Sequence, residues 1–523
     1  MSEPAFSYDV VSYPSNPLPQ AHPARLAAIA RLHGVPTASP NRCRFLEVAC
    51  GDGANLLPLA LAYPNSNFVG IDLSGTAIAR GEDLRSRLGL ANLKLVAADL
   101  TAWDPGPDRY DYIISHGLYS WVPPQVRDAL FALCRDRLSP AGLAYVSYNA
   151  LPGCHVRRVL WDILRFHVRD FTDPAERIQQ ATAMLQFLSK AVVGNAPLPE
   201  LFREEIRWAQ DKTDPSVLYH DDLANINDPV SITDFVAHAS RFGLQFLSEA
   251  EYFEMTPDLL PPVAADLLRK LAERDVVLKE QYLDFLKLRR FRQTVLCPAG
   301  LAVRREADER AVFQLEVTGE PVPDPDPPDL ALGVPIKFRT AKGAAISTDH
   351  PIAKAALLEV REAFPYPLAA SELLMLARRR ARAGGDDPED KDGIAKLLYG
   401  CYRVGMVDLY LDPPRFARTA GARPKLSPLA RAQLDRGGET MSSLRSTVVQ
   451  MASPIGLEMF KLLDGRRDRE TLVTELANRA AGDPKFVAPG QPPQPASWWR
   501  ERLATEVESG LAMAAKMALL VEE

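Results

Sequence analysis

The sequence predicts an α/β fold whose N-terminal part is a Rossmann-like domain, and three short segments carry this prediction. Residues 45–53 form an apolar strand that runs into a glycine turn; residues 68–72 and 93–99 form two further strands, each ending in an acid. A glycine turn at the end of a strand lets backbone N–H groups approach a ligand, and an acid about 20 residues later can accept hydrogen bonds from ribose hydroxyls. The third acid, Asp99, lies one strand further on, where it can read an adenine amino group. We therefore expect a nucleotide site.

The spacing of the glycines distinguishes between classes of nucleotide site. A dinucleotide turn has a third glycine three residues after the second, but Leu56 occupies that position. No Lys-Ser/Thr pair follows the glycines, so a Walker loop is excluded. The turn reads Ala49-x-Gly51-x-Gly53 and resembles motif I of the class I S-adenosylmethionine (SAM) methyltransferases, with alanine in place of the first glycine of the motif. An ordinary βαβ turn without a ligand is the alternative.

The resemblance to motif I implies a role for each residue near the turn. Glu47 would lie near the amino group of SAM, Asp72 at the ribose and Asp99 at the adenine, and the product would be S-adenosyl-L-homocysteine. Cys50 is expected to be a small residue near the methionine part of SAM, because a cysteine without a paired base is a poor nucleophile. The residues expected to bind the cofactor are Tyr13, Glu47, Cys50, Gly51, Gly53, Asp72, Leu73, Asp99, Leu100 and Ser115.

Composition restricts the class of protein. The chain has 523 residues, enough for about three domains. It contains no long apolar run and no N-terminal charged segment followed by an apolar one, so we expect a cytoplasmic protein without a membrane helix. The net charge of −6 argues against a general nucleic-acid binder. The six cysteines show no C-x-x-C pair and the eight histidines no metal-binding spacing, so we expect no metal site.

Strands and helices alternate in the first domain, residues 1–155. Strands are expected near 44–49, 67–72, 93–97, 110–115 and 142–148, and helices near 53–63, 74–88 and 123–138. Such alternation predicts a parallel sheet covered on both faces, with ligands bound at the carboxyl ends of the strands.

The rest of the chain is expected to form a helical middle domain, a linker and a C-terminal domain. In the middle domain, residues 156–317, we expect an insert of helices and loops at 219–254 and an amphipathic helix with a basic end at 279–297. Five prolines between Thr318 and Pro328 indicate a stiff linker, residues 318–334. The C-terminal domain, residues 335–523, is winged-helix-like and repeats one plan of helices and a strand. Its arginine-rich helix end (Arg378, Arg379, Arg380, Arg382) is followed by acids at 386–392 and is expected to be a solvated, self-neutralised surface.

Several runs outside motif I resemble one bacterial family. They are Tyr8–Ser15 with His22-Pro23, Ile114–Pro123, Tyr145–Gly153, Leu218–Leu223, Phe246–Ala250 and Glu280–Phe285. Over residues 5–300 the chain resembles methyltransferases with a methyltransferase regulatory domain, a group that includes the rickettsial protein-lysine methyltransferases that modify outer-membrane protein. The resemblance implies a catalytic SAM domain, a middle domain, a C-terminal domain and a homodimer.

Methyl transfer requires in-line alignment of acceptor and methyl group in a pocket that excludes water. A lysine acceptor must also lose a proton, against an ordinary pKa near 10.4, which a desolvated pocket with a hydroxyl or imidazole favours. We expect His116, Tyr119 and Tyr148 to be catalytic, and Trp121 and Asn149 to line the substrate pocket. A structural role for His116 and core packing of Tyr148 and Trp121 are the alternatives.

Two further features bear on the acceptor and on the cofactor. The segment after the fourth strand reads Ser-His-Gly and not Asn-Pro-Pro-Tyr, the motif of amide and base methylators, which disfavours adenine or glutamine acceptors. Tyr13 and His22 precede the first strand, where class I methyltransferases often fold a lid over SAM; a purely structural arm is the alternative.

The sequence leaves four hypotheses for the function. The first is a methyltransferase that acts on lysine side chains of a protein. The second is a methyltransferase of a small molecule or natural product. The third is a SAM-binding regulatory protein without turnover. The fourth, a nucleic-acid methyltransferase that docks through winged helices, requires a basic face and steeply salt-dependent binding.

Overall fold

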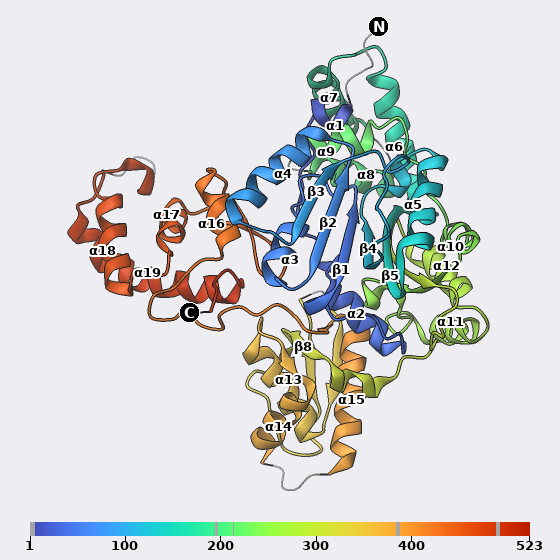
Figure 1. The fold of residues 1–523 in the computed structure, drawn as a ribbon. Coiled ribbons are helices and arrows are strands. Elements are labelled where there is room, and N and C mark those ends of the chain that lie inside the picture. Colours follow the sequence, from blue (N-terminus) through green and yellow to red (C-terminus); the bar gives the residue numbers. More distant parts are fainter. Residues whose placement is uncertain are drawn as a thin grey trace.

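The structure is a computed structural model that describes residues 6–522 except 193, 195, 196, 213, 342, 383–386 and 488–491. Figure 1 shows a central sheet with helices on both faces and two smaller units beside it. One unit contains the helices α13 (Pro351–Ala363), α14 (Ala370–Ala381) and α15 (Pro388–Arg403). The other contains α16 (Pro428–Asp435), α17 (Pro454–Leu462), α18 (Arg469–Ala480) and α19 (Ala496–Lys516).

Among the described residues, seven strands form the central sheet, in the order β3-β2-β1-β4-β5-β7-β6. The parallel strands are β1 (Arg44–Val48), β2 (Asn67–Asp72), β3 (Leu93–Ala97), β4 (Tyr110–Ser115) and β5 (Leu138–Asn149), which confirms the predicted strands. β7 (Phe291–Pro298) runs antiparallel to β5 and to β6 (Leu244–Glu249). The predicted Rossmann-like fold class is therefore correct.

Alternate side chains of β1 enter two apolar cores, one on each face of the sheet. Phe45 packs with Phe68 of β2 in one core, and Leu46 and Val48 belong to the other. The faces are covered by the expected helices α3 (Leu56–Ala62), α4 (Gly75–Leu88) and α5 (Pro124–Arg137). α4 begins at Ser74, whose hydroxyl accepts a hydrogen bond from the Ala77 N–H, as is usual at a helix start.

The predicted boundary at residue 155 is wrong, because the segment expected to be helical completes the sheet. β6 and β7 both come from residues 156–317. They are buried nearly throughout, so their sequences lack the alternation of a half-buried strand. The helix expected at 279–297 ends at Lys287, and Leu288 is left-handed with φ 45°. Its expected basic end contributes Arg292, which is fully buried in β7.

Helices of the middle segment lie at the carboxyl edge of the sheet and beside β5 (Figure 1). They are α6 (Cys154–His167), α7 (Pro174–Ala191), α8 (Pro197–Gln210), α9 (Pro215–Val217), the π-helical turn η4 (Leu218–Asp222), α10 (Ile232–Arg241), α11 (Pro262–Arg274) and α12 (Val276–Lys287). The buried Arg292 ties α12 to this edge, with hydrogen bonds to Asp284 at 2.7 and 2.8 Å and to Glu249 at 2.7 Å.

The predicted linker is also corrected, because it begins inside a folded unit. β8 (Glu316–Gly319) is the central strand of a sheet, between β12 (Leu368–Ala369) and β13 (Val407–Tyr410). The buried Thr318 hydroxyl of β8 donates to the Pro365 carbonyl. β9 (Val322–Asp324) is the edge strand of a sheet with β10 (Ile336–Arg339) and β11 (Ala345–Thr348). Proline is tolerated at a sheet edge, so this proline-rich segment can be ordered.

Both C-terminal units have the helix and strand content expected of winged helices. In the first, α13, α14 and α15 pack against β8, β12 (Leu368–Ala369) and β13 (Val407–Tyr410); the second adds the hairpin β14 (Thr440–Ser442) and β15 (Val448–Gln450). The arginine-rich end of α14 is neutralised in part as expected: Arg378 pairs with Asp390 of the acidic run, whereas Arg380 pairs with Glu359 of α13.

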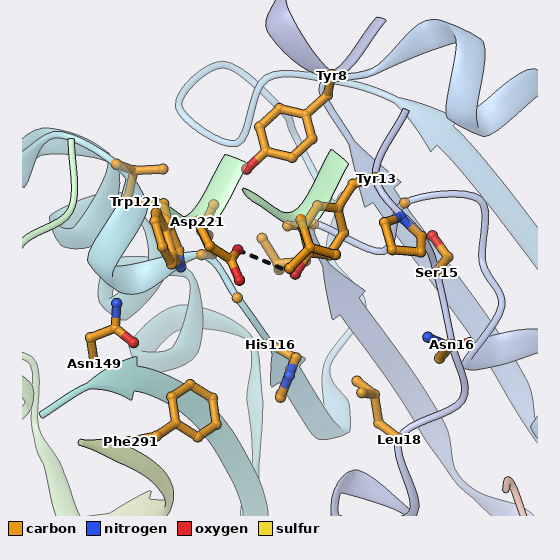
Figure 2. A pocket seen from close by; sticks show the side chains of 18 of the residues that line it. Tyr8, Tyr13, Ser15, Asn16, Leu18, His116, Trp121, Asn149, Asp221 and Phe291 are labelled. Atoms are coloured by element: carbon orange, nitrogen blue, oxygen red, sulfur yellow. Dashed lines mark hydrogen bonds between the residues drawn. The ribbon is translucent and has the colours of Figure 1, made fainter. Parts of the chain in front are cut away.

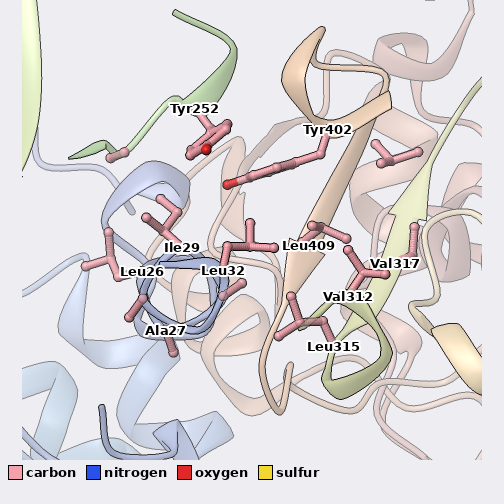
Figure 3. Close-up of a cluster of buried hydrophobic side chains, with 14 of the residues drawn as sticks. Leu26, Ala27, Ile29, Leu32, Tyr252, Val312, Leu315, Val317, Tyr402 and Leu409 are labelled. Carbon is pink, nitrogen blue, oxygen red and sulfur yellow. The ribbon is translucent and has the colours of Figure 1, made fainter. Parts of the chain in front are cut away.

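The helix α2 (Pro23–Leu32) joins the sheet domain to the first C-terminal unit. Figure 3 shows Leu32 on the side of this helix that faces Tyr402 and Leu409 of that unit, and these side chains belong to one continuous apolar core. Arg25 pairs with Glu251 at 3.3 Å and Asp408 at 3.2 Å. Because the two parts share a core, cleavage near residue 320 would not be expected to release the first 300 residues as an independent unit.

Candidate functional site

A cavity of about 1620 Å³ opens at the carboxyl ends of β1, β2 and β4. This is where parallel α/β sheets bind their ligands. Its walls come from the N-terminal arm (residues 6–18), the glycine turn, the ends of the strands, and α6, α8 and η4 of the middle segment. Sites for small molecules are usually about 300–1,000 Å³. This cavity therefore has room for a nucleotide and a second ligand.

The glycine turn has the left-handed backbone that its composition predicts, with φ of 57° at Gly51 and 75° at Gly53. A Cβ on Gly51 would lie 2.6 Å from the Ser15 hydroxyl, which would have to rotate away, and the positive φ adds a strain that glycine avoids. Gly51 borders the cavity. Gly53 lies behind it, where a Cβ would meet Leu95 of β3 at 3.0 Å. Ala49 is left-handed as well, with φ 61°.

Glu47 is buried at the end of β1 and lines the cavity. Its carboxylate accepts a 3.1 Å hydrogen bond from the Asn55 amide, and burial raises its pKa to about 8. The Asn55 carbonyl oxygen in turn accepts from the Leu18 N–H of the arm at 2.9 Å. A cationic group of a ligand would favour the charged form of Glu47.

Asp72 lies at the end of β2, and both of its oxygens accept backbone N–H hydrogen bonds. The donors are Gly51 and Ser74, each at 2.8 Å. Burial raises the pKa of Asp72 above its usual value. Leu73 follows with an apolar side chain that is 53% exposed and lines the cavity. Asp72 thus fixes the shape of the glycine turn while it faces the cavity.

Asp99 and Leu100 form the cavity wall after β3. The Asp99 carboxylate accepts from the backbone N–H and the hydroxyl of Thr101, both at 2.8 Å, and these bonds lower its pKa. Cys50 also borders the cavity, and burial raises the pKa of its thiol well above the usual value. A neutral thiol agrees with the expectation that Cys50 is not a nucleophile.

The N-terminal arm lies across the cavity, as expected of a lid. On one side the Asp9 carboxylate accepts hydrogen bonds from the hydroxyls of Ser74 and Thr76, both at 2.6 Å. On the other side the Tyr13 hydroxyl donates to Asp221 of η4 at 3.3 Å. His22, in contrast, does not line the cavity; it is buried at the start of α2, where its ring accepts from the Ala24 N–H.

His116 lies just after β4 and faces the middle of the cavity in Figure 2. Its Nδ1 is 2.9 Å from the Tyr145 hydroxyl, and its ring meets Phe291 edge to face. Burial lowers its pKa to about 4. The imidazole is therefore neutral near pH 7 and can accept or donate a hydrogen bond.

Trp121 and Asn149 also line the cavity, on the side away from the glycine turn. Asn149 ends β5, and its side-chain amide donates to Asn227 at 2.8 Å. These two residues lie where the sequence predicted a substrate pocket.

Four predicted site residues are absent from the cavity wall formed by the described residues: Gly53, which lies behind it, and Tyr119, Tyr148 and Ser115. Tyr119 is buried and its hydroxyl is 2.8 Å from His238; Tyr148 is buried and its hydroxyl is 3.2 Å from Thr294. Both hydroxyls are used inside the core, so the structure contradicts their catalytic assignment. Ser115 is fully buried in β4 and does not reach a cofactor in this cavity.

Several residues of the cavity wall were not predicted from the sequence. Tyr8 of the arm and Asp221 of η4 line it, together with Arg157, Glu205 and Trp208 of the middle helices. Asp221 belongs to the run Leu218–Leu223, whose mixture of aromatic, histidine and acidic residues was a usable signal. Without the structure, nothing connected that run to the arm.

The rim contributed by the end of α12 and the start of β7 carries three basic residues. Each is paired with an acid: Lys287 with Glu254 at 3.3 Å, Arg289 with Asp284 at 3.1 Å and Arg290 with Glu205 at 2.8 Å. This rim is consequently not a free anion-binding surface. In the part of the chain that the structure describes, no group of His, Cys, Asp or Glu is arranged to hold a metal ion. Over the same residues, none of the helices has the length and apolar character needed to cross a bilayer.

Three family models match the chain. One described as a methyltransferase domain matches residues 45–142, and one described as a predicted methyltransferase regulatory domain matches residues 214–298. The third, described as the PKMT C-terminal winged helix domain, matches residues 422–519. These regions correspond to the sheet, the segment with β6 and β7, and the second C-terminal unit.

Two relatives come from Rickettsia prowazekii. The uncharacterized protein RP789 is 32% identical over 372 residues, which are 70% of this chain and 67% of that protein. The uncharacterized protein RP028 is 32% identical over 242 residues, which are 46% of this chain and 96% of that protein.

The whole architecture recurs in a solved structure, PKMT2 from Rickettsia typhi in complex with AdoHcy. It is 25% identical, and the match covers 98% of this chain and 100% of that chain with a TM-score of 0.86. A second structure of PKMT2 gives a TM-score of 0.85 with the same coverage.

Proposed function

Because this chain belongs to the family of SAM-dependent methyltransferases that carry a methyltransferase regulatory domain, we propose that it methylates lysine side chains of a protein. The name of PKMT2, the solved structure similar over nearly the whole chain, supports an acceptor of this kind. So does the size of the cavity, which exceeds the needs of a nucleotide alone.

The observation that carries the proposal is the division of the cavity into two sides. Ser15 and Asn16 lie on one side of Tyr13, and Trp121 and Asp221 lie on the other, as Figure 2 shows. Ser15 lies against Gly51 of the glycine turn, so the turn belongs to the first side. The first side contains the residues expected to bind the cofactor. The second is left for an acceptor. In Figure 2 His116 lies below the gap between Asp221 and Tyr13, and Phe291, which contacts the His116 ring, lies below Asn149.

The residues on the first side fit the chemistry of SAM. Glu47 offers a buried carboxylate to an amino group, and Gly51 offers a backbone without a Cβ. Asp72 and Asp99, at the ends of β2 and β3, would accept hydrogen bonds from the ribose hydroxyls and the adenine amino group. When bound, SAM would supply an electrophilic methyl carbon on its sulfonium sulfur. A neutral amine would attack that carbon in line, so that the N–C bond forms as the C–S bond breaks; S-adenosylhomocysteine would leave, and the methylated ammonium would give a proton to solvent.

The other side must accept a lysine and let it lose a proton. The neutral imidazole of His116 can hydrogen-bond an amine without adding positive charge, which would oppose binding of the cation. The apolar ring of Phe291 beside it reduces access of water to the reacting nitrogen. The segment after β4, Ser115-His116-Gly117, is unlike the motif of amide and base methylators.

A labelling experiment tests the acceptor class. The protein is incubated with methyl-labelled SAM and cell lysate, which is then separated into protein, nucleic acid and small molecules. We expect label in the protein fraction, and on lysine residues after digestion and mass spectrometry. An Asp72→Ala variant serves as the control for transfer that depends on the site. Label only in nucleic acid or only in small molecules would exclude a lysine acceptor, and no label in any fraction would favour a SAM-binding protein without turnover.

We also propose that the protein acts as a homodimer. The helices α11 and α12 support this, because Val263, Leu267, Phe285 and Leu286 are between 52% and 86% exposed. Exposed apolar patches of this kind often mark protein interfaces. Light scattering should give twice the chain mass, and Val263→Glu with Leu267→Glu should lower it to that of one chain. A single-chain mass for the unmodified protein would contradict this proposal.

A further inference from the structure

Two tyrosine rings and a carboxylate form one corner of the cavity. Tyr8 and Tyr13 come from the arm, with ring centroids 6.2 Å apart and planes inclined by 58°. Tyr8 stacks on His220 of η4 at 4.0 Å, which fixes the angle of the ring. The next residue, Asp221, accepts the hydrogen bond from the Tyr13 hydroxyl. These contacts, with the hydrogen bond between the His220 ring and the Val11 carbonyl at 2.7 Å, hold the arm against η4 beside an acid.

The charge of Asp221 is less fully compensated than that of its neighbour. Lys212 lies 2.5 Å from the Asp222 carboxylate but 3.4 Å from that of Asp221. Asp222 also receives hydrogen bonds from the indole of Trp161 at 2.9 Å and from Arg157 at 3.2 Å. The two acids share one lysine, and the acid that lines the cavity is the more distant from it. Burial raises the pKa of Asp221 above its usual value, and a cation beside it would favour the charged carboxylate.

The aromatic walls reinforce the attraction for a cation. Burial raises the pKa of Tyr8 to about 12 and that of Tyr13 further, so both phenols stay neutral at physiological pH. The faces of neutral aromatic rings attract ammonium groups, most strongly where water is excluded. Trp121 lies across from Asp221 and gives the corner a third aromatic wall.

We propose that the corner formed by Tyr8, Tyr13, Trp121 and Asp221 binds the side-chain ammonium group of the acceptor and makes the enzyme specific for primary amines. This inference rests on the proposed function, since it names the subsite that receives the lysine. An alcohol would gain little from an acid flanked by aromatic rings, and a carboxylate would be repelled.

The position of the corner assigns it to the acceptor and not to the positive sulfur of SAM. Asp221 and Trp121 lie on the far side of Tyr13 from the arm residues that contact the glycine turn. His116 lies between the two sides. A lysine that enters past Trp121 would place its ammonium group at Asp221 and could move toward His116 once its proton has left to solvent.

Binding of a small amine to the whole protein tests the proposal without turnover. The protein is saturated with S-adenosylhomocysteine, and n-butylammonium and the neutral n-butanol are compared by saturation-transfer NMR titration. We expect n-butylammonium to bind at least about tenfold more tightly than n-butanol. Asp221→Asn should remove this preference while leaving the affinity for S-adenosylhomocysteine within about twofold of its original value. Equal binding of the two probes, or an unchanged preference in Asp221→Asn, would overturn the proposal.

Two further variants keep the outcome interpretable. Asp228→Asn makes the same charge change seven residues away, outside the cavity lining, and should leave the preference for n-butylammonium intact. Tyr8→Leu removes one ring but leaves the ion pairs of Asp221 in place, so it provides the test if Asp221→Asn does not fold; it should weaken n-butylammonium binding about threefold or more. No binding of S-adenosylhomocysteine by the unmodified protein would count against the proposed function itself, whereas loss of the amine preference alone leaves that function standing.

Discussion

The side-chain amide of Asn55 donates a 3.1 Å hydrogen bond to the carboxylate of Glu47, and both side chains are buried. The same Asn55 side chain accepts a hydrogen bond from the Leu18 N–H. The acid expected to meet the amino group of SAM is thereby connected to the arm that covers the cavity. A change in the charge of Glu47 should alter its hydrogen bond to Asn55 and, through Asn55, the contact with the arm. Substitutions of Glu47 therefore test this connection.

Binding of SAM at pH 7 should release a proton from Glu47. In the free protein burial raises the pKa of Glu47 to about 8, so the carboxyl is mostly protonated at pH 7. A cationic amino group beside it favours the carboxylate and lowers this pKa. The affinity should therefore rise with pH up to about 8. Calorimetry at pH 7 in two buffers with different heats of ionisation counts the released proton, and Glu47→Gln should abolish it. Equal proton release by both proteins would remove Glu47 from the amino group.

Replacement of Asp72 should weaken the binding of SAM and S-adenosylhomocysteine. Asp72→Ala should cost about 1.5–3 kcal/mol, the range for a lost hydrogen bond to a charged group. The structure adds a second reason, because Asp72 also holds the Gly51 and Ser74 N–H groups. Calorimetry with each ligand measures the change, and circular dichroism checks that the variant is folded. An unchanged affinity in a folded Asp72→Ala protein would exclude a ribose contact.

Replacement of Ala49 by glycine should stabilise the protein, although replacement of alanine by glycine usually destabilises a protein. Its φ of 61° is in the left-handed region, where glycine has no steric penalty. Ala49→Gly should raise the free energy of unfolding by about 0.5–1 kcal/mol, and Ala49→Val should lower it by about 1–3 kcal/mol. Ala79→Gly, on the exposed face of α4, is the control and should cost about 1 kcal/mol. Urea denaturation measures all three, and a loss of stability in Ala49→Gly similar to that of the control would contradict the argument.

Turnover should rise with pH above neutrality, and His116 should not titrate in that range. The acceptor amine must be neutral to react, whereas His116 is already neutral because burial lowers its pKa to about 4. If His116 orients the amine, His116→Ala should lower kcat by about 10²–10⁴-fold with little change in the affinity for S-adenosylhomocysteine. Steady-state rates from pH 6 to 10 check both points. A step near pH 6–7 that disappears in His116→Ala would show that His116 titrates there instead.

The two tyrosines first expected to be catalytic should behave as core residues. Tyr119→Phe and Tyr148→Phe each remove one hydroxyl that is hydrogen-bonded inside the protein. Each should lower the free energy of unfolding by about 0.5–1.5 kcal/mol and leave turnover within about threefold of the original value. A loss of turnover of 100-fold in a stable Tyr148→Phe protein would return that residue to the active site.

The cofactor side of the cavity could be predicted because topology alone places it. The carboxyl ends of β1, β2 and β3 meet at one edge of a parallel sheet. An acid or a glycine at the end of each strand can therefore be assigned to the ligand site from the order of the strands alone. The acceptor side could not be predicted in the same way. Tyr13 and Asp221 are 208 positions apart, and only the folded chain brings them together.

The errors have equally physical causes. Tyr119 follows β4 and Tyr148 lies near the end of β5, as expected, but whether such a side chain points into the core or the cavity depends on the neighbours it packs against. β7 contains Arg292, and an arginine in a sequence is expected at the surface. In the structure Glu249, Glu280 and Asp284 surround it and pair with it. Buried charges are paired in this way, and a linear sequence does not reveal the pairing.

The route of the chain through the central sheet sets an order of events during synthesis. β5 ends at Asn149, but β7, which pairs with it, begins at Phe291. At about 5–20 residues per second, the ribosome needs on the order of 10–30 seconds to supply the intervening residues. Throughout that interval the nascent sheet exposes an unpaired edge, which is a template for aggregation. Expression of this protein should therefore benefit from slow induction or from chaperones that bind exposed strands, and fragments that stop before residue 298 should accumulate in inclusion bodies.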